Sequence, residues 1–123
     1  NWAVSWNNLG VLYIRMGNPD EAKEAFKKSI QIGKLNLAYE NMALLLLIYD
    51  TPEKAHKYTT DLIKIYPTNN KLWWILAYIE YKRGNLSGAL AASEKAYSIS
   101  PDKNNFNLYN SLRNGSRIDI PSK

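Results

Sequence analysis

The stretch Trp6–Phe26, WNNLGVLYIRMGNPDEAKEAF, decides the fold because its pattern of large and small residues returns twice further along the chain. The copies are spaced by 33 to 34 residues and together span most of the 123 residues. A fixed period of this length indicates a stacked array, in which each unit buries its apolar face only against its neighbours. The sequence therefore predicts a scaffold, whose function is expected to be the binding of another molecule and not catalysis.

The repeated positions hold the same kinds of residue in the three copies. In the first copy they are Trp6, Leu9, Gly10, Tyr13, Gly17, Ala22 and Phe26. In the second they are Tyr39, Met42, Ala43, Leu46, Ala55 and Leu62, closed by Pro67. In the third they are Trp73, Leu76, Ala77, Gly84, Ala89 and Ala96, closed by Pro101. This pattern resembles the tetratricopeptide repeat, a helix–turn–helix unit of about 34 residues.

The resemblance implies an all-α fold, a right-handed superhelical array of antiparallel helix pairs. It divides the domain at 1–115 into repeats 3–35, 36–69 and 70–103 and a C-terminal capping helix at 104–114. A solenoid needs such a cap because its last repeat would otherwise expose an apolar face. We expect 116–123 to be a polar, disordered tail.

Helical spacing, glycines and prolines place the individual helices. Gly17 suits the left-handed residue that ends a helix, and Asn18-Pro19 suits the start of the next one. The expected helices cover about 3–16, 19–32, 36–49, 52–65, 70–83, 86–99 and 104–114.

In the family, the eighth and twentieth positions of a repeat are small because its two helices cross closely there. Here they hold Gly10, Ala22, Ala43, Ala55, Ala77 and Ala89. Several other positions depart from the family pattern, namely Lys34, Thr59, Leu62, Glu80 and Ser93. We expect altered packing at these positions and not a different fold.

The sequence offers no catalytic constellation. It has no cysteine and a single histidine, so the usual transition-metal ligand sets are missing. His56 lies beside Lys54 and Lys57 and is interpreted as a solvent-exposed surface residue. Paired acids such as Asp20-Glu21 suit the positive end of a helix dipole. We therefore expect a protein that is not an enzyme and that carries no cofactor and no metal.

The net charge of +5 is modest, and the lysines are interspersed with acids. A solvated surface explains them, and we expect no nucleic-acid partner. The longest apolar run, Met42–Tyr49, is too short to span a bilayer, so we expect no membrane insertion. We expect no signal peptide, and a cytoplasmic compartment is slightly favoured. Since the chain has no starting Met, we expect a piece of a longer protein with room for upstream repeats.

The resemblance implies that the first helix of each repeat lines a concave groove. The residues carried over to this groove, and predicted to bind a partner, are Asn8, Val11, Glu40, Asn41, Leu44, Leu47, Ile48, Lys71, Trp74, Ile75, Tyr78, Tyr81 and Lys82. A contiguous exposed apolar patch of this kind usually marks an interaction surface. The alternative is that some of these side chains, such as Leu44 or Ile48, are core between successive helices. Trp73 stands at a packing position and is predicted to be core.

Some members of the family grip an acidic C-terminal tail with a clamp of Lys, Asn, Asn, Lys and Arg. The corresponding positions here hold Asn7, Val11, Asn41, Lys71 and Ile75. Only Asn41 and Lys71 match, so the sequence argues against a clamp for acidic tails. The apolar floor favours an apolar or amphipathic segment as ligand, with Asn8, Glu40 and Asn41 able to bond its backbone.

The leading hypothesis is a non-catalytic protein–protein interaction scaffold. One alternative is a homo-oligomerisation module, in which two copies bury the same apolar surface against each other. Another is a C-terminal appendage of a larger enzyme, including a membrane-bound, glycan-transferring one.

Overall fold

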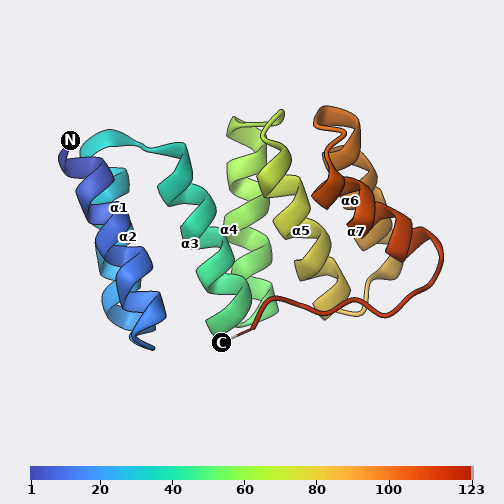
Figure 1. Ribbon diagram of the computed structural model, residues 1–123, viewed down its shortest axis with the longest axis horizontal. Coiled ribbons are helices and arrows are strands. Elements are labelled where there is room, and N and C mark those ends of the chain that lie inside the picture. The colour runs from blue at the N-terminus through green and yellow to red at the C-terminus, as the bar shows by residue number, and fades with distance from the viewer. Residues whose placement is uncertain (123) are drawn as a thin grey trace.

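The computed structural model describes residues 1–122, and within them the fold is built from α-helices alone. The helices are α1 (Trp2–Arg15), α2 (Pro19–Gly33), α3 (Asn36–Tyr49), α4 (Pro52–Ile65), α5 (Asn70–Lys82), α6 (Leu86–Ile99) and α7 (Lys103–Arg113). They stand side by side along the long axis of the molecule as three pairs followed by α7 (Figure 1). The predicted all-α helical repeat array is confirmed, and the helix bounds agree with the expected ones to within one residue.

Short polar side chains start several of the helices. The side chains of Thr51, Asn69 and Asn85 each accept a hydrogen bond from the backbone N–H three residues further on, at 3.3, 3.2 and 3.0 Å. Asn18 makes no such bond at the start of α2, where a proline occupies the first turn instead. Gly17 has φ of 77°, the left-handed conformation that the sequence predicted for it.

The first helix pair shows why small residues recur in the sequence. A Cβ added to Gly10 on α1 would fall 2.4 Å from a ring carbon of Phe26 on α2. Glycine therefore lets the aromatic ring lie directly against the backbone of the neighbouring helix. The alanines at the corresponding small positions of the array are all fully buried: Ala22, Ala43, Ala55, Ala77 and Ala89. These positions lie where the helices cross most closely.

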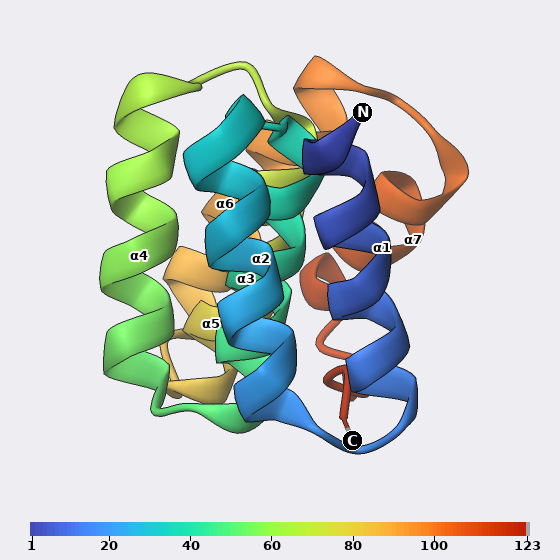
Figure 2. The same cartoon turned by 90° about the vertical axis from the view of Figure 1, so that its left-hand side faces the viewer.

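The middle pair is more open than the other two. Helices α3 and α4 contact each other less than α1 and α2, or α5 and α6, do. Figure 2 shows α4 at the outer edge of the array. Thr59 stands on α4 where the much larger Phe26 stands on α2, so less of the space between the helices is filled. Packing is therefore altered around one of the positions where the sequence departs from the repeat pattern.

Helix α7 closes the array by packing on α6. Its Asn105 is buried, and the Nδ2 atom donates to Asn70 Oδ1 at 3.0 Å and to the carbonyl oxygens of Ser100 and Ala96 at 2.9 and 3.2 Å. A buried amide that makes these bonds ties α7 to both helices of the preceding pair. Helix α7 thus covers the last pair, as the resemblance implied for a cap.

The tail segment, residues 116–122, is not the disordered tail that the sequence predicted. Lys123, the last residue of that prediction, lies outside the described residues. It follows Gly115 and runs back across α5 toward the end of α3 (Figure 1). Ile118 is 9% exposed, Ile120 is partly buried, and both pack against the hydrophobic core. The prediction was wrong because it weighed the average polarity of the segment. Two isoleucines that reach an apolar surface offset the cost of ordering a short stretch of chain.

Candidate functional site

The first helices of the three pairs, α1, α3 and α5, line one side of the array, which we call the groove face. Two hydrogen bonds join these helices. Asn41 Nδ2 on α3 donates to Asn7 Oδ1 on α1 at 3.0 Å, and Lys82 Nζ on α5 donates to the Leu47 carbonyl on α3 at 2.8 Å. That carbonyl lies in the last turn of α3, where a cation is favoured by the helix dipole. The bonds fix how the three helices sit beside one another.

Most residues predicted to line the groove keep accessible side chains. Those that are half-buried or exposed are Asn8, Val11, Glu40, Asn41, Leu44, Ile48, Lys71, Trp74, Tyr78, Tyr81 and Lys82. Leu47 and Ile75 were predicted wrongly, since they are 1% and 0% exposed and belong to the core. The reason is that α3 and α5 contact each other directly, so side chains that point along the row of first helices are covered.

Trp73 differs from its prediction in the opposite direction. It was expected in the core, yet it packs against the core while staying half-buried. Its indole Nε1 donates to the carbonyl oxygen of Pro67 at 2.8 Å, which holds the polar edge of the ring at the loop before α5. Trp is rarely buried completely, because its N–H needs a partner.

The polar residues of the groove face are largely engaged within the chain. Glu40 Oε2 accepts from Asn69 Nδ2 at 3.0 Å, and Asn41 is bonded to Asn7 as described above. The Nζ atom of Lys71 lies 4.1 Å from the ring centroid of Trp74, a cation–π contact. Asn8 is exposed. Two of the three side chains predicted to bond a peptide backbone, Glu40 and Asn41, therefore already have partners.

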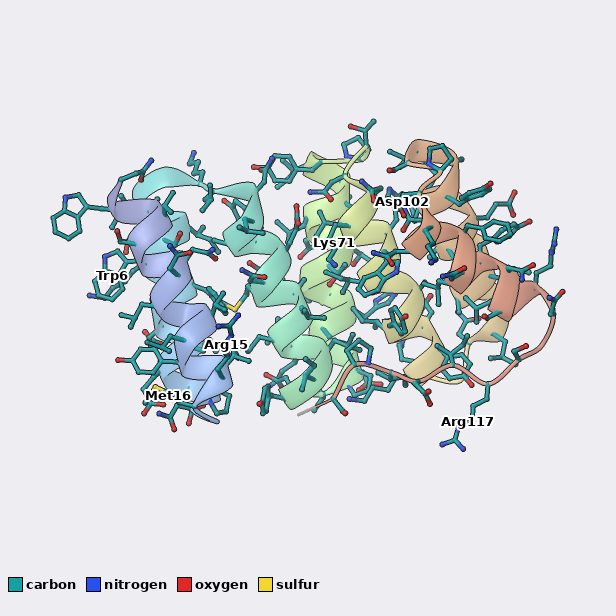
Figure 3. All side chains as sticks on the ribbon, viewed as in Figure 1. Trp6, Arg15, Met16, Lys71, Asp102 and Arg117 are labelled. Atoms are coloured by element: carbon teal, nitrogen blue, oxygen red, sulfur yellow. The ribbon has the colours of Figure 1, made fainter. Side chains whose placement is uncertain are left out.

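The N-terminal half of the groove face is an open hollow of about 540 Å³. It is lined by Asn7, Asn8, Val11, Leu12, Arg15, Leu37 and Asn41. Figure 3 shows Arg15 on the side of α1 that faces α3. Leu12 was missed by the sequence analysis because it is not one of the groove positions that the resemblance implies. The signal that could have found Leu12 is an apolar residue at a position that packing within the helix pair leaves half-exposed.

The C-terminal half of the groove face is covered by the tail segment. The backbone N–H of Ile118 donates to the phenol oxygen of Tyr81 at 3.3 Å. Beside it, Trp74 and Tyr78 meet edge to face with ring centroids 4.7 Å apart. Burial, and then the nearby charge of Asp119, raise the pKa of Tyr78, so its phenol keeps its proton and can donate a hydrogen bond. A small hollow of about 290 Å³ remains between the tail segment, α5 and α7.

A larger hollow of about 680 Å³ lies on another side of the array, between α2, α3 and α4. Its floor includes Tyr39, Met42 and Leu46, and lysines stand at its rim. Burial and the neighbouring Tyr39 raise the pKa of Tyr58 in this hollow to about 12. This hollow lies where the middle helix pair is open, and no pattern in the sequence predicted it.

His56 is not the freely exposed residue that the sequence predicted. Its Nε2 lies 3.6 Å from Glu80 Oε1, and its side chain is 31% exposed. Glu80 is buried and also pairs with Arg83 at 2.7 Å, while Asn85 Nδ2 donates to it at 3.2 Å. The buried carboxylate of Glu80, which stands where the first repeat has Tyr13, is thus satisfied by one polar neighbour on α4 and two in the turn after α5.

Residues 1–122 contain neither a cluster of metal-ligating side chains nor a helix suited to cross a membrane. No group of three or more His, Cys, Asp or Glu side chains in this part of the chain has the geometry to hold a metal ion. In the same residues, no helix combines the length and apolarity that crossing a membrane requires.

Paired helices that stack in a row and leave one side open define a helical-repeat scaffold. Residues 3–33 match the family model of the tetratricopeptide repeat. This stretch is therefore a tetratricopeptide repeat, and the resemblance to the family is confirmed. None of the curated proteins matches the sequence significantly.

Several solved structures, two of them described as tetratricopeptide repeat domains, have the same fold over nearly the whole of this chain. The first such domain of Spaghetti (RPAP3), bound to the HSP90 peptide SRMEEVD, has a TM-score of 0.77 at 16% identity and covers 93% of this chain and 92% of its own. The first domain of the human RPAP3 protein, solved by NMR, has a TM-score of 0.79 at 16% identity, with 92% and 91% covered. The UNC-45 chaperone, described as binding and folding muscle myosin, has a TM-score of 0.73 at 21% identity and covers 92% of this chain and 13% of its own.

Proposed function

We propose that this chain is a non-catalytic protein-interaction scaffold, which binds an extended apolar or amphipathic segment of another protein on its groove face. The observation that carries the proposal is the aromatic surface of α5, where Trp74, Tyr78 and Tyr81 are half-buried on one helix. Such side chains give large contact area for little loss of conformational freedom, and they dominate the energetics of interfaces. The open hollow beside α1 extends this surface toward the N-terminus.

The peptide bound by the Spaghetti domain is acidic, and that chemistry fits this chain poorly. Among the positions of the family's acidic-tail clamp, Val11 and Ile75 stand where Asn and Arg are expected, and Ile75 is fully buried. Asn41 is bonded to Asn7, and Lys71 lies over the ring of Trp74. The groove face therefore lacks the convergent cations of a carboxylate clamp, which supports an apolar ligand.

The test is selection of peptides from a displayed random library on the intact chain, followed by binding measurements with variants. We expect apolar or amphipathic peptides, and we expect Tyr78→Glu to weaken their binding at least tenfold, because it places a charge in the aromatic surface. Leu86→Glu is the matched control, since it changes an exposed apolar residue on α6 outside the groove face.

Circular dichroism of each variant reports whether the helices remain folded. Peptides that bind both variants equally would contradict the proposed site. Loss of helix in Tyr78→Glu would show that Tyr78 holds the fold together, and Val11→Glu on α1 then takes its place as the groove variant. Sedimentation velocity over a range of concentrations separates peptide binding from self-association of the chain.

A further inference from the structure

Within residues 1–122, the tail segment lies on the groove face without belonging to a repeat. Residues 116–122 form neither helix nor turn, and they run as an open stretch of chain across α5 (Figure 1). Since Ile118 and Ile120 are two residues apart in this stretch, their side chains can point to the same side. Both pack against the core, and Asp119 between them is exposed. A peptide that lies on a helical surface and packs every second side chain against it makes contacts of this kind.

We propose that residues Arg117–Pro121 are a resident occupant of the α5 part of the groove face, which a partner displaces. We further propose that this partner is an extended segment with the same apolar–acidic–apolar order as Ile118–Ile120. The proposal rests on the proposed function, because it names the chemistry of the ligand and the state of the site before the ligand binds.

The contacts of the tail segment favour specific docking over chance collapse. Its backbone is bonded to the chain at a defined point, from the N–H of Ile118 to the phenol oxygen of Tyr81. Asp119 and Tyr78 line the same hollow between the tail segment, α5 and α7. An acid at this position can accept a hydrogen bond from a phenol that keeps its proton, so the surface suits an acidic residue between two apolar ones.

The same contacts are too few to hold the segment permanently. Within residues 1–122, no salt bridge joins the tail segment to the helices, and Arg117 points away from the array (Figure 3). The indole Nε1 of Trp74 is buried with no hydrogen-bond acceptor among the described residues. A buried donor without a partner lowers the stability of the arrangement around it, and the tail segment lines the same hollow as Trp74. A partner that offers an acceptor at this point would gain a bond that the tail segment does not make.

The experiment compares the intact chain with a variant whose tail segment is released, Ile118→Asp with Ile120→Asp. The probe is a fluorescent synthetic peptide with the sequence of residues 116–122, SRIDIPS. We expect it to bind the released variant at least tenfold more tightly than the intact chain. We also expect Tyr78→Glu in the released variant to remove this binding. Ser116→Asp is the matched control, because it adds an acid at an exposed position of the same segment.

Several results would overturn the proposal. Equal affinity of the peptide for the intact and released chains would show that the tail segment does not compete. No binding to the released chain would show that the groove face does not recognise this chemistry. Loss of a dimer on release, seen by sedimentation velocity, would place the segment in the groove of a second copy. If the double Asp variant loses helix, Ile118→Ser with Ile120→Ser releases the segment without new charge.

Failure of this inference differs from failure of the proposed function. If library peptides bind through Tyr78 equally well in the intact and released chains, the groove binds ligands and only the role of the tail segment is wrong. If neither library peptides nor the tail peptide bind through Tyr78 in either chain, the proposed function itself is wrong.

Discussion

Two buried polar atoms have no hydrogen-bond partner among residues 1–122, namely the hydroxyl of Thr59 and the indole N–H of Trp74. They differ in their surroundings. Thr59 is fully buried on α4 in the open middle pair, whereas Trp74 lines the hollow between the tail segment, α5 and α7. The first is a local defect of packing, and the second lies where we propose that a ligand binds.

Replacing Thr59 with Val should stabilise the fold. The two side chains have nearly the same shape, and the change removes a buried hydroxyl that has lost its water without gaining a partner. We expect the free energy of unfolding to rise by about 1 kcal/mol, measured by chemical denaturation. Thr60→Val is the control, because the Thr60 hydroxyl donates to the His56 carbonyl at 2.8 Å and should give no gain. A loss of stability in Thr59→Val would mean that the hydroxyl has a partner in solution.

For single residues, the sequence correctly predicted which positions need a small side chain. It failed for residues whose burial depends on a neighbouring repeat. Gly10 is small because little else fits against the ring of Phe26, and Ala22 at the other small position of this repeat is fully buried. Leu47 and Ile75 were assigned to the groove because a position in the repeat tells which side of its own helix a residue occupies. It does not tell how closely the first helix of the adjacent repeat approaches that side. His56 was misjudged for a related reason, since its partner Glu80 comes from the next repeat.

At the scale of the elements, the start of α7 depends on Asp102. Its carboxylate accepts a hydrogen bond from the backbone N–H of Asn105 at 2.9 Å and from the hydroxyl of Ser100 at 3.0 Å. The backbone bond from Asn105 is the main reason that the pKa of Asp102 is lowered. Since a lowered pKa means that folding favours the ionised form, this contribution to stability is present at neutral pH. It is lost as the pH falls through the pKa of the folded state.

Asp102→Asn should therefore make the fold less sensitive to acid, because it keeps an acceptor oxygen at the helix start and removes the charge. We expect the wild type to be the more stable chain at neutral pH and the difference to shrink below about pH 4. Denaturant unfolding of both chains at several pH values measures this. A constant difference across that range would show that the charge of Asp102 plays no part.

The tail segment is the element that the sequence analysis missed. Helices can be predicted from apolar residues that recur periodically over about a dozen positions. Two isoleucines in a short polar stretch form no such pattern. Their significance comes from the surface that they meet, which is built by α5 and α7 from other parts of the sequence. The capping helix itself was predicted, because covering the last repeat is a requirement of the array.

Along the whole array, the contacts between helices are not spread evenly. In a helical-repeat array each unit is held by its neighbours, so a helix with fewer contacts opens more easily. Helix α4 contacts its neighbours α3 and α5 less than α2 and α6 contact theirs. The period of the sequence predicted the array and the order of its helices. It did not predict that the middle pair would be open.

We expect backbone amides in α4 to exchange with solvent deuterium faster than those in α2 and α6, measured under conditions where the chain stays folded. The three helices have similar lengths, of 14, 15 and 14 residues, so end fraying affects them alike. Uniform exchange across the three helices would mean that the array opens only as a unit.

The covalent link between the tail segment and α7 has a consequence for any measured affinity. Only a short stretch around Gly115 separates Ile118 from the end of the last helix, so the segment is held near its site at an effective concentration on the order of millimolar. A free partner competes against this local concentration. The binding free energy obtained on the intact chain is therefore the difference between that of the partner and that of the tethered tail segment. Fusion partners or labels placed at the C-terminus would change that free energy without touching a single residue of the site.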